Sequence, residues 1–225
     1  MTFHDFKTIL SKVPKEVEIV FAGMAEPWLN KWATDMVLYS FDQGYKVGVY
    51  TTTVGMDEDD ARKLRGLPFS YFTIHLPDAD GLMTLKVTDS YLLTLLMTMQ
   101  AVPKHNKMVI GRLHPEVEKY TGPVEDGSKG LLSRAGSIKT LAINRKTGPL
   151  ECSACGPKID HNVVLPNGDT LLCCMVYNLE HVIGNLIHGT YEDLFKSEEY
   201  NRVMAGLKDD SIDIACRRCE ISTPI

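Results

Sequence analysis

The first 151 residues of this 225-residue chain contain no cysteine, and all six cysteines lie from Cys152 to Cys219. The sequence also lacks an apolar run approaching the roughly 18 residues that a membrane-spanning helix needs. The amino terminus has no basic stretch followed by an apolar run and a small-residue cleavage site, as a secretory signal would. We therefore expect a soluble cytoplasmic protein that does not associate with membranes.

Clustered positive charge is absent as well. The 24 Lys and Arg are scattered and are outnumbered by 29 Asp and Glu, which gives a formal net charge of −5. Affinity for a phosphate backbone comes mainly from grouped Lys and Arg, so the composition argues against a nucleic-acid partner. With 44% hydrophobic and 24% charged residues, the chain has the composition of an ordinary globular protein of one or two domains.

Short β-branched and apolar stretches alternate with helical patterns through the first part of the chain. The expected strands are residues 17–21, 46–51, 71–76 and 108–113, with a further short one at 131–133. The expected helices are residues 4–12, 31–43, 57–64 and 88–102. This alternation predicts an α/β fold with a parallel sheet, closed or open, and helices outside it.

Ligands of such folds gather where the strands end at their carboxyl edge. The residues expected there are Gly23, Met24, Ala25, Glu26, Pro27, Thr51, Thr52, Thr53, His75, Arg112 and His114. Several have an alternative interpretation: the segment around Gly23 as a solvated turn, His75 as a core or rim histidine, and Arg112 and His114, like Arg134 further on, as surface ion-pair partners.

The carboxy-terminal third has a different pattern. Residues 163–165 and 170–173 predict two strands of a β-hairpin, because Asn167-Gly168 between them supplies the positive φ of a tight turn. Residues 190–203 predict a helix capped by Thr190. The loop-like composition of residues 120–129 separates this region from the α/β pattern.

The cysteines form two CxxC pairs, Cys152–Cys155 and Cys216–Cys219, with Cys173 and Cys174 between them in sequence. CxxC spacing lets two sulfurs reach one metal centre from a single turn. Inert buried thiols are the alternative, but two such pairs with no cysteine elsewhere favour a metal site in a protein without export signals. The spacing by itself does not distinguish structural zinc from an iron–sulfur cluster.

The segments 165–174, 183–186, 191–195 and 216–219 resemble the SPASM/twitch extension of radical S-adenosylmethionine (radical SAM) enzymes. Gly168 and Cys173 match the Gly-x4-Cys element of that extension. The resemblance implies one auxiliary 4Fe-4S cluster, with Cys173, Cys216, Cys219 and either Cys152 or Cys155 as its ligands. We expect Cys174, on the opposite strand face, to be a packed free thiol.

The first 140 residues resemble the later part of a radical SAM partial barrel. The pentapeptide Gly23-Met24-Ala25-Glu26-Pro27 matches the GGE-type motif, which in that family contacts the methionyl amine of S-adenosylmethionine. The resemblance implies cofactor or substrate contacts for Thr51, Thr53 and His75. It also implies a cavity lined by Arg112, His114 and Arg134, where arginine suits a carboxylate because its planar fork donates two parallel hydrogen bonds.

The CxxxCxxC motif that holds the catalytic cluster in this family does not occur in the 225 residues. We therefore expect the carboxy-terminal portion of a radical SAM/SPASM oxidoreductase or maturase, inactive on its own, or a natural short relative. Its expected domains are an incomplete (β/α) partial barrel at residues 1–140 and a small cysteine-rich β-hairpin/helix domain at 141–225.

The expected partners are a peptide or small-molecule substrate, whose identity the residues do not indicate, and a reductase or other electron donor. The alternative hypothesis is a non-catalytic module that binds zinc or an iron–sulfur cluster for electron transfer or protein interaction on a remnant barrel.

Overall fold

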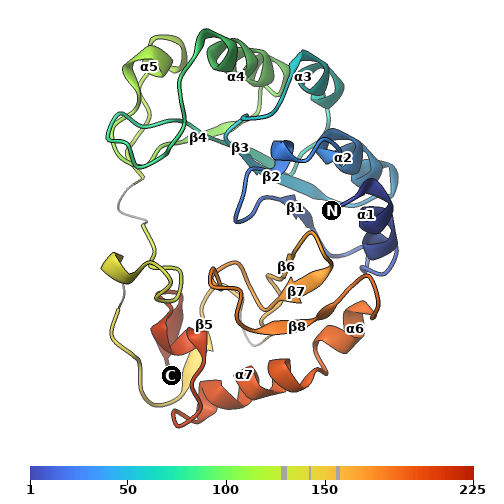
Figure 1. Ribbon diagram of the computed structural model, residues 1–225, viewed down its shortest axis with the longest axis vertical. Helices are drawn as coiled ribbons and strands as arrows, with labels where there is room; N and C mark the ends of the chain where they lie inside the picture. Colours follow the sequence, from blue (N-terminus) through green and yellow to red (C-terminus); the bar gives the residue numbers. More distant parts are fainter. Residues whose placement is uncertain (128–130, 142, 156–157) are drawn as a thin grey trace. The chain divides into compact units, whose positions relative to one another are not determined.

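The computed structural model describes residues 1–127, 131–141, 143–155 and 158–225 (Figure 1). Its contacts divide the chain into two compact units. The first, here called the barrel unit, is Lys15–Leu131, and the second, the cysteine unit, combines Met1–Pro14 with Leu132–Ile225. The amino-terminal 14 residues therefore pack with the cysteine-bearing part. The expected domains at 1–140 and 141–225 stay a prediction.

The barrel unit contains one four-stranded parallel sheet in the order β1-β2-β3-β4. Its strands are β1 (Ile19–Phe21), β2 (Val47–Thr51), β3 (Tyr71–His75) and β4 (Asn106–Met108). The helices α2 (Ala33–Asp42), α3 (Glu58–Leu64) and α4 (Asp89–Ala101) lie along one face of the sheet (Figure 1). This confirms the predicted incomplete (β/α) barrel of parallel strands.

The core of the barrel unit lies between that face of the sheet and the helices. Val49, Phe72 and Ile74 from the strands pack with Leu64 and Leu95 from the helices, and all five are fully buried. A buried side chain of this size contributes about 1.5–3 kcal/mol by leaving water. The sheet is thus held by its helical cover, which fixes the positions of the strand ends.

The fourth strand differs from the prediction of residues 108–113. β4 ends at Met108, and beyond it only isolated bridges form, at Val109 and at Leu113. Gly111 adopts a φ of +85°, and its amide donates to Asp126 Oδ1 at 2.8 Å instead of to a strand. A short helix, α5 (Pro115–Thr121), follows and was not predicted.

The cysteine unit is built from short antiparallel pieces. β5 (Leu150–Cys152) pairs with β9 (Ser222–Pro224), and β6 (Val163–Val164), β7 (Asp169–Leu171) and β8 (Val182–Asn185) form a second sheet. The pairing of β6 with β7 confirms the predicted hairpin. Its turn is closed by hydrogen bonds from Gly168 N to Leu165 O and from Leu165 N to Asp169 O, at 2.9 and 2.8 Å.

Two other predictions for this unit were wrong. Residues 190–203 are not one helix, because Ser197 caps a new start and separates α6 (Tyr191–Leu194) from α7 (Glu198–Lys208). Residues 131–133 form no strand, because the Ser133 amide donates to the Glu220 carboxylate rather than to a neighbouring strand.

The remaining elements of the described chain are short helical segments. They are α1 (Phe3–Leu10), η1 (Pro27–Leu29), η3 (Lys139–Leu141) and η4 (Ala215–Arg218). Lys12, just after α1, donates from Nζ to the carbonyls of Leu186 and Ile187 at 2.8 and 2.7 Å, which ties the amino-terminal segment to the end of β8. None of the helices among the described residues has the length and apolar character to cross a membrane.

Gly168→Ala tests the hairpin turn. Gly168 has a φ of +86°, and a Cβ there would lie 2.6 Å from Ile187 Cγ1. The positive φ costs a non-glycine residue about 1–2 kcal/mol, and overpacking adds about 1–3 kcal/mol. We expect urea unfolding to show a loss of about 2–5 kcal/mol in the free energy of unfolding.

Gly148→Ala is the matched control in the same unit, because its φ is +73° but nothing lies within 4 Å of a Cβ there. It should lose only the backbone contribution of about 1–2 kcal/mol. Equal losses in the two variants would contradict a steric role for the Gly168 site.

Candidate functional site

All six cysteines belong to the cysteine unit, and five of them gather in one region of it. Cys152 lies on β5 opposite Ser222 of β9, Cys173 follows β7, and Cys216 lies in η4 three residues before Cys219. Cys152, Cys155 and Cys173 pack against the apolar cluster that contains Cys216, while Cys173 also packs against the cluster that contains Cys219. The fold therefore brings both CxxC pairs and the hairpin cysteine to one region, as the sequence pattern suggested.

The gathered thiols are free and are half-buried or buried. None of the six cysteines forms a disulfide, and Cys216 and Cys219 are buried whereas Cys174 is exposed. The expectation that Cys174 is a packed thiol on the opposite strand face was thus wrong, because β7 ends at Leu171 and Cys174 lies exposed in the turn beyond it.

Burial dominates the acid–base behaviour of these thiols. Burial is the largest cause, neighbouring thiols add to it, and together they raise the pKa of Cys155, Cys173 and Cys216 to about 12. Burial also raises the pKa of Cys219, although the amides of Ile221 and Ser222 lower it. Without a metal these groups are neutral thiols, and metal binding would replace their protons.

Hydrogen bonds already point at two of the sulfurs. Cys155 N donates to Cys152 Sγ at 3.3 Å, and Ile221 N donates to Cys219 Sγ at 3.4 Å. Amide donors of this kind surround the sulfurs of iron–sulfur sites and influence their potential. As the side chains stand, no three His, Cys, Asp or Glu groups among the described residues converge closely enough to hold a single metal ion.

His181 connects the segments that carry two of these cysteines. Its carbonyl accepts from Leu172 N at 3.0 Å, and its Nε2 accepts from Ala215 N at 2.9 Å. Leu172 and Ala215 immediately precede Cys173 and Cys216. Because Nε2 accepts, Nδ1 carries the proton and donates to Glu199 Oε1 at 2.5 Å. One buried histidine thereby fixes the approach of two cysteine-bearing segments.

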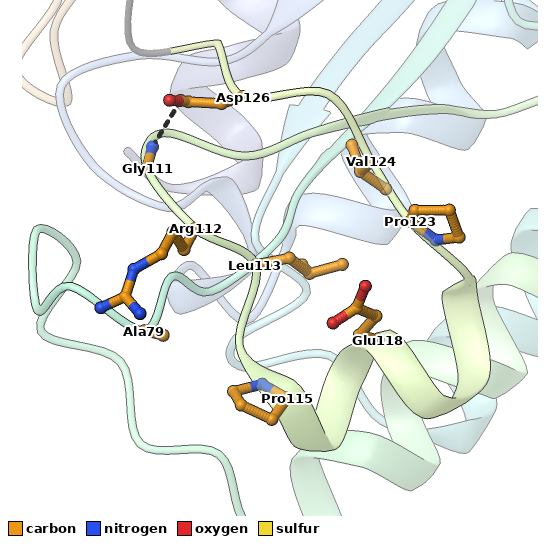
Figure 2. A pocket seen from close by; sticks show the side chains of 9 residues that line it. All are labelled: Ala79, Gly111, Arg112, Leu113, Pro115, Glu118, Pro123, Val124 and Asp126. Carbon is orange, nitrogen blue, oxygen red and sulfur yellow. Dashed lines mark hydrogen bonds between the residues drawn. The ribbon is translucent and has the colours of Figure 1, made fainter.

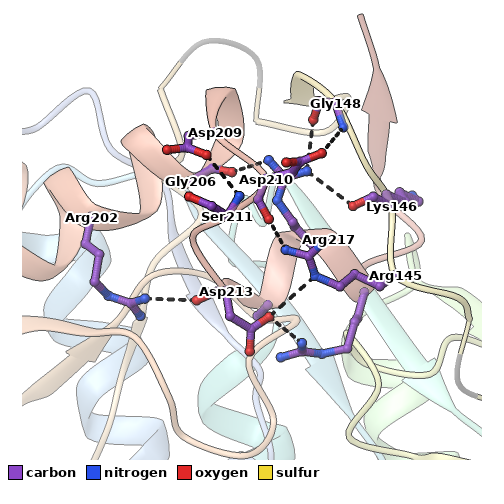
Figure 3. A network of polar contacts seen from close by, with 12 residues as sticks. Arg145, Lys146, Gly148, Arg202, Gly206, Asp209, Asp210, Ser211, Asp213 and Arg217 are labelled. Carbon is purple, nitrogen blue, oxygen red and sulfur yellow. Dashed lines mark hydrogen bonds and ion pairs between the residues drawn. The ribbon is translucent and has the colours of Figure 1, made fainter.

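Two cationic side chains, Arg217 and Lys146, hold the second CxxC turn. Arg217, fully buried, donates to the carbonyls of Lys146, Gly148 and Gly206 at 3.2, 2.9 and 2.6 Å (Figure 3). In return, Lys146 N donates to Arg217 O at 2.7 Å. The Lys146 ammonium donates to the carbonyls of Cys219 and Ser222 and to Ser222 Oγ. The turn is therefore tied to the 146–148 segment from both sides.

In the barrel unit, the structure brings together the ends of β1 and β2. The Glu26 carboxylate accepts from Thr51 Oγ1 at 2.7 Å and from both the amide and the hydroxyl of Thr52 at 2.6 Å. It also accepts from Trp28 N at 3.1 Å, which caps η1. Glu26 therefore shapes the loop that begins at Gly23, whose φ is +146°.

Thr53 and His75 differ in access. Thr53 is 1% exposed and has a φ of 65°, so its side chain belongs to the interior of the barrel unit. His75 is half-buried at the end of β3, with its ring centroid 6.0 Å from that of Tyr50 in an edge-to-face arrangement.

Arg112 and His114 follow β4 in the same unit. The side chain of Arg112 is 79% exposed and pairs with Asp80, with Nε and Nη2 at 2.7 and 2.6 Å from Oδ1. His114 caps α5 by accepting from Glu116 N at its Nδ1. In the loops at the carboxyl end of the sheet, Arg112 thus forms an ion pair and His114 caps a helix.

A cavity of 460 Å³ lies beside Arg112 (Figure 2). Glu118 directs its carboxylate toward Leu113 in this cavity, while the Arg112 guanidinium extends toward Ala79 and its partner Asp80. The sequence suggested that Arg112 could bind a carboxylate ligand, but its Nε and Nη2 already donate to Asp80.

Arg134 belongs to the cysteine unit and not to a strand end. It lies in a left-handed turn in which Arg134 and Ala135 have φ values of 54° and 52°. Its Nη1 lies 3.8 Å from Met175 Sδ, and its guanidinium carbon lies 5.1 Å from the centre of the Tyr177 ring. Met175 packs in the cluster that contains Cys219, so the guanidinium lies in the neighbourhood of the gathered thiols.

Thr52, whose amide and hydroxyl both donate to Glu26, lies in the Thr51–Thr53 run that the sequence placed at the end of the second strand. Sequence analysis did not single out Lys146 or His181. Lys146 and His181 belong to no motif, because their contacts come from segments distant in sequence, such as Ser222 and Ala215.

The comparisons with known proteins agree with this geometry. Residues 145–220 match the family model of SPASM, described as an iron-sulfur cluster-binding domain. No curated protein sequence matches the chain.

Solved structures with a similar fold include two proteins. BtrN in complex with AdoMet and 2-DOIA has a TM-score of 0.62 and 15% identity, with 100% of this chain and 81% of that one covered. Native anSMEcpe with bound AdoMet has a TM-score of 0.57 and 11% identity, with 98% and 78% covered. At these identities the likeness shows the fold.

Glu199→Gln tests the His181 network. The hydrogen bond from Arg202 lowers the pKa of Glu199 to about 2, against the opposing effect of burial and together with the bond from His181. A lowered pKa in the folded state stabilises the protein above the ordinary glutamate range, and this contribution is lost as the pH falls toward 2.

Urea unfolding from about pH 5 to about pH 3 should therefore show the wild-type protein losing its advantage over Glu199→Gln. The exposed neighbour Glu198 is the control, and Glu198→Gln should follow the wild-type pH profile. A constant difference between wild type and Glu199→Gln over this range would contradict the assigned network.

Proposed function

We propose that this radical SAM/SPASM-related chain, whose residues 145–220 form a SPASM domain, binds one auxiliary 4Fe-4S cluster for an oxidoreductase or maturase reaction. The observation that carries the proposal is the gathering of Cys152, Cys155, Cys173, Cys216 and Cys219 in one region of the cysteine unit. The ligands would be Cys173, Cys216, Cys219 and one of Cys152 and Cys155.

The donor set fits this group. Thiolates are the ligands that iron–sulfur clusters prefer, and the buried, reduced thiols need a cation to replace their protons if they are to be charged. The thiolates of a four-iron cluster bind different iron atoms and need not meet at one point. A single zinc ion differs in that its four ligands surround one centre, and the match of residues 145–220 to an iron-sulfur cluster-binding domain supports the cluster.

The barrel unit would contribute to a site for S-adenosylmethionine. Gly23 leaves the backbone of the loop open to an approaching ammonium, and Glu26 holds that loop through Thr51, Thr52 and Trp28. When bound and reduced by a catalytic cluster, this cofactor supplies radical chemistry. Since no CxxxCxxC motif occurs in the 225 residues, we assign cluster binding, and not the cleavage step, to this chain.

Arg134 would face the substrate near the auxiliary cluster. Its guanidinium makes contacts with Met175 Sδ and the Tyr177 ring but no ion pair among the described residues, so its paired donors are available to a carboxylate or another anion. The substrate would be a peptide or a small molecule, and a reductase would supply electrons, in a cytoplasmic setting that keeps the thiols reduced.

Anaerobic reconstitution with iron and sulfide tests the cluster. We expect broad absorbance near 400 nm, typical of such clusters, with iron and sulfide bound in equal amounts. Cys173→Ala and Cys216→Ala should lose most of the bound iron, because each removes a proposed ligand, half-buried Cys173 or buried Cys216. Cys174→Ala is the matched control, since the exposed Cys174 is next to Cys173 but is not a proposed ligand.

Cys152→Ala and Cys155→Ala, compared side by side, would identify the fourth ligand by which of them loses iron. Binding of one zinc ion and no iron by the wild-type chain would contradict the cluster. Equal loss of iron in Cys173→Ala, Cys216→Ala and Cys174→Ala would contradict the ligand assignment. An iron-loaded chain that does not bind S-adenosylmethionine would favour an electron-transfer module instead.

A further inference from the structure

Lys146 holds the carbonyl end of the second CxxC turn. Its Nζ donates to Cys219 O at 2.6 Å, to Ser222 O, and to Ser222 Oγ at 3.2 Å, which uses all three donors of the ammonium. Ser222 Oγ in turn donates toward the carbonyls of Cys216 and Cys219, at 2.5 and 3.0 Å. The ammonium is therefore linked to both cysteines of the turn through one serine.

The position of Lys146 is set by its own backbone. Its amide donates to Arg217 O at 2.7 Å, and its carbonyl accepts from Arg217 Nη1 at 3.2 Å. Figure 3 shows the hydrogen bond from the Arg217 guanidinium to the Lys146 carbonyl. Because both its amide and its carbonyl are hydrogen-bonded to Arg217, the backbone of Lys146 has a fixed position from which the side chain reaches the CxxC turn.

The charge of Lys146 has no carboxylate partner in the part of the chain that the structure describes. The ion pairs there involve its neighbour Arg145, which lies 3.9 Å from Asp213, but not Lys146. The side chain is partly buried, and its acceptors are three uncharged oxygens. A charge in such surroundings acts over a longer range than one in water.

We propose that Lys146 is a positioning residue that also sets the reduction potential of the auxiliary cluster. This inference rests on the proposed function. A cluster held by thiolates is anionic and becomes more so on accepting an electron. A fixed ammonium hydrogen-bonded to the carbonyl of the ligand Cys219 stabilises the reduced form more than the oxidised form. Lys146 thus makes the cluster easier to reduce.

The experiment compares the reconstituted 225-residue chain with its variants by redox titration, followed by absorbance and electron paramagnetic resonance. Lys146→Met and Lys146→Gln remove the charge, and Lys146→Arg keeps it. Arg145→Met is the matched control, because Arg145 is adjacent and charged but pairs with Asp213. We expect both neutral variants to shift the midpoint potential to more negative values, and Lys146→Arg and Arg145→Met to remain near wild type.

The spectroscopic readout separates this role from a purely structural one. Loss of the cluster in both neutral variants, with retention in Lys146→Arg, would also support a need for the charge. A wild-type potential in Lys146→Met and Lys146→Gln, or loss of the cluster in Lys146→Arg as well, would overturn the inference while leaving the cluster itself established. A wild-type chain that binds no iron would overturn both proposals.

Discussion

The buried guanidinium of Arg217 is the contact on which the cysteine unit depends. It joins the turn between Cys216 and Cys219 to Lys146 and Gly148 on one side and to Gly206 of α7 on the other. Placing a charge at zero exposure is costly unless its donors are satisfied, and here backbone carbonyls satisfy most of them. The hydrogen bonds to the 146–148 segment and to Gly206 offset the cost of removing the guanidinium from water.

The consequences extend to the other thiols. Ser222 follows the turn into β9, which pairs with β5 and so places Cys152 beside it. His181 connects the residue before Cys216 with the residue before Cys173. The unit therefore has few regular elements but several side chains that each join segments distant in sequence, as expected for a small domain whose core includes ligands for a metal group.

The barrel unit follows a different principle. There the burial of Val49, Phe72 and Ile74 under the helices fixes the sheet, and the loops at its carboxyl edge are free to carry polar groups. Glu26 uses that freedom to connect the ends of two adjacent strands. The two units thus place their candidate binding groups by different means, sheet packing in one and polar contacts in the other.

Elements with a strong local signal were predictable. The strands β1, β2 and β3 are rich in apolar residues, the helices near residues 57 and 88 begin at Asp57 and Thr88 caps, and Asn167-Gly168 specifies a hairpin turn. The predicted strands were wrong where the carboxylate of a distant residue accepts a hydrogen bond from a backbone amide of the segment. Asp126 ends the fourth strand early by accepting from Gly111, and Glu220 prevents a strand at residues 131–133 by accepting from Ser133.

The sequence alone determined which groups the chain carries and where its sheet forms: two CxxC pairs and a Gly-x4-Cys element supply thiols, and a repeated strand–helix pattern specifies a parallel sheet. Only the tertiary structure decided which groups surround those thiols. Lys146, His181 and Arg217 act through contacts with segments tens of residues away, and no local spacing encodes such contacts. Ligand type is a property of side chains, whereas their electrostatic surroundings are a property of the folded chain.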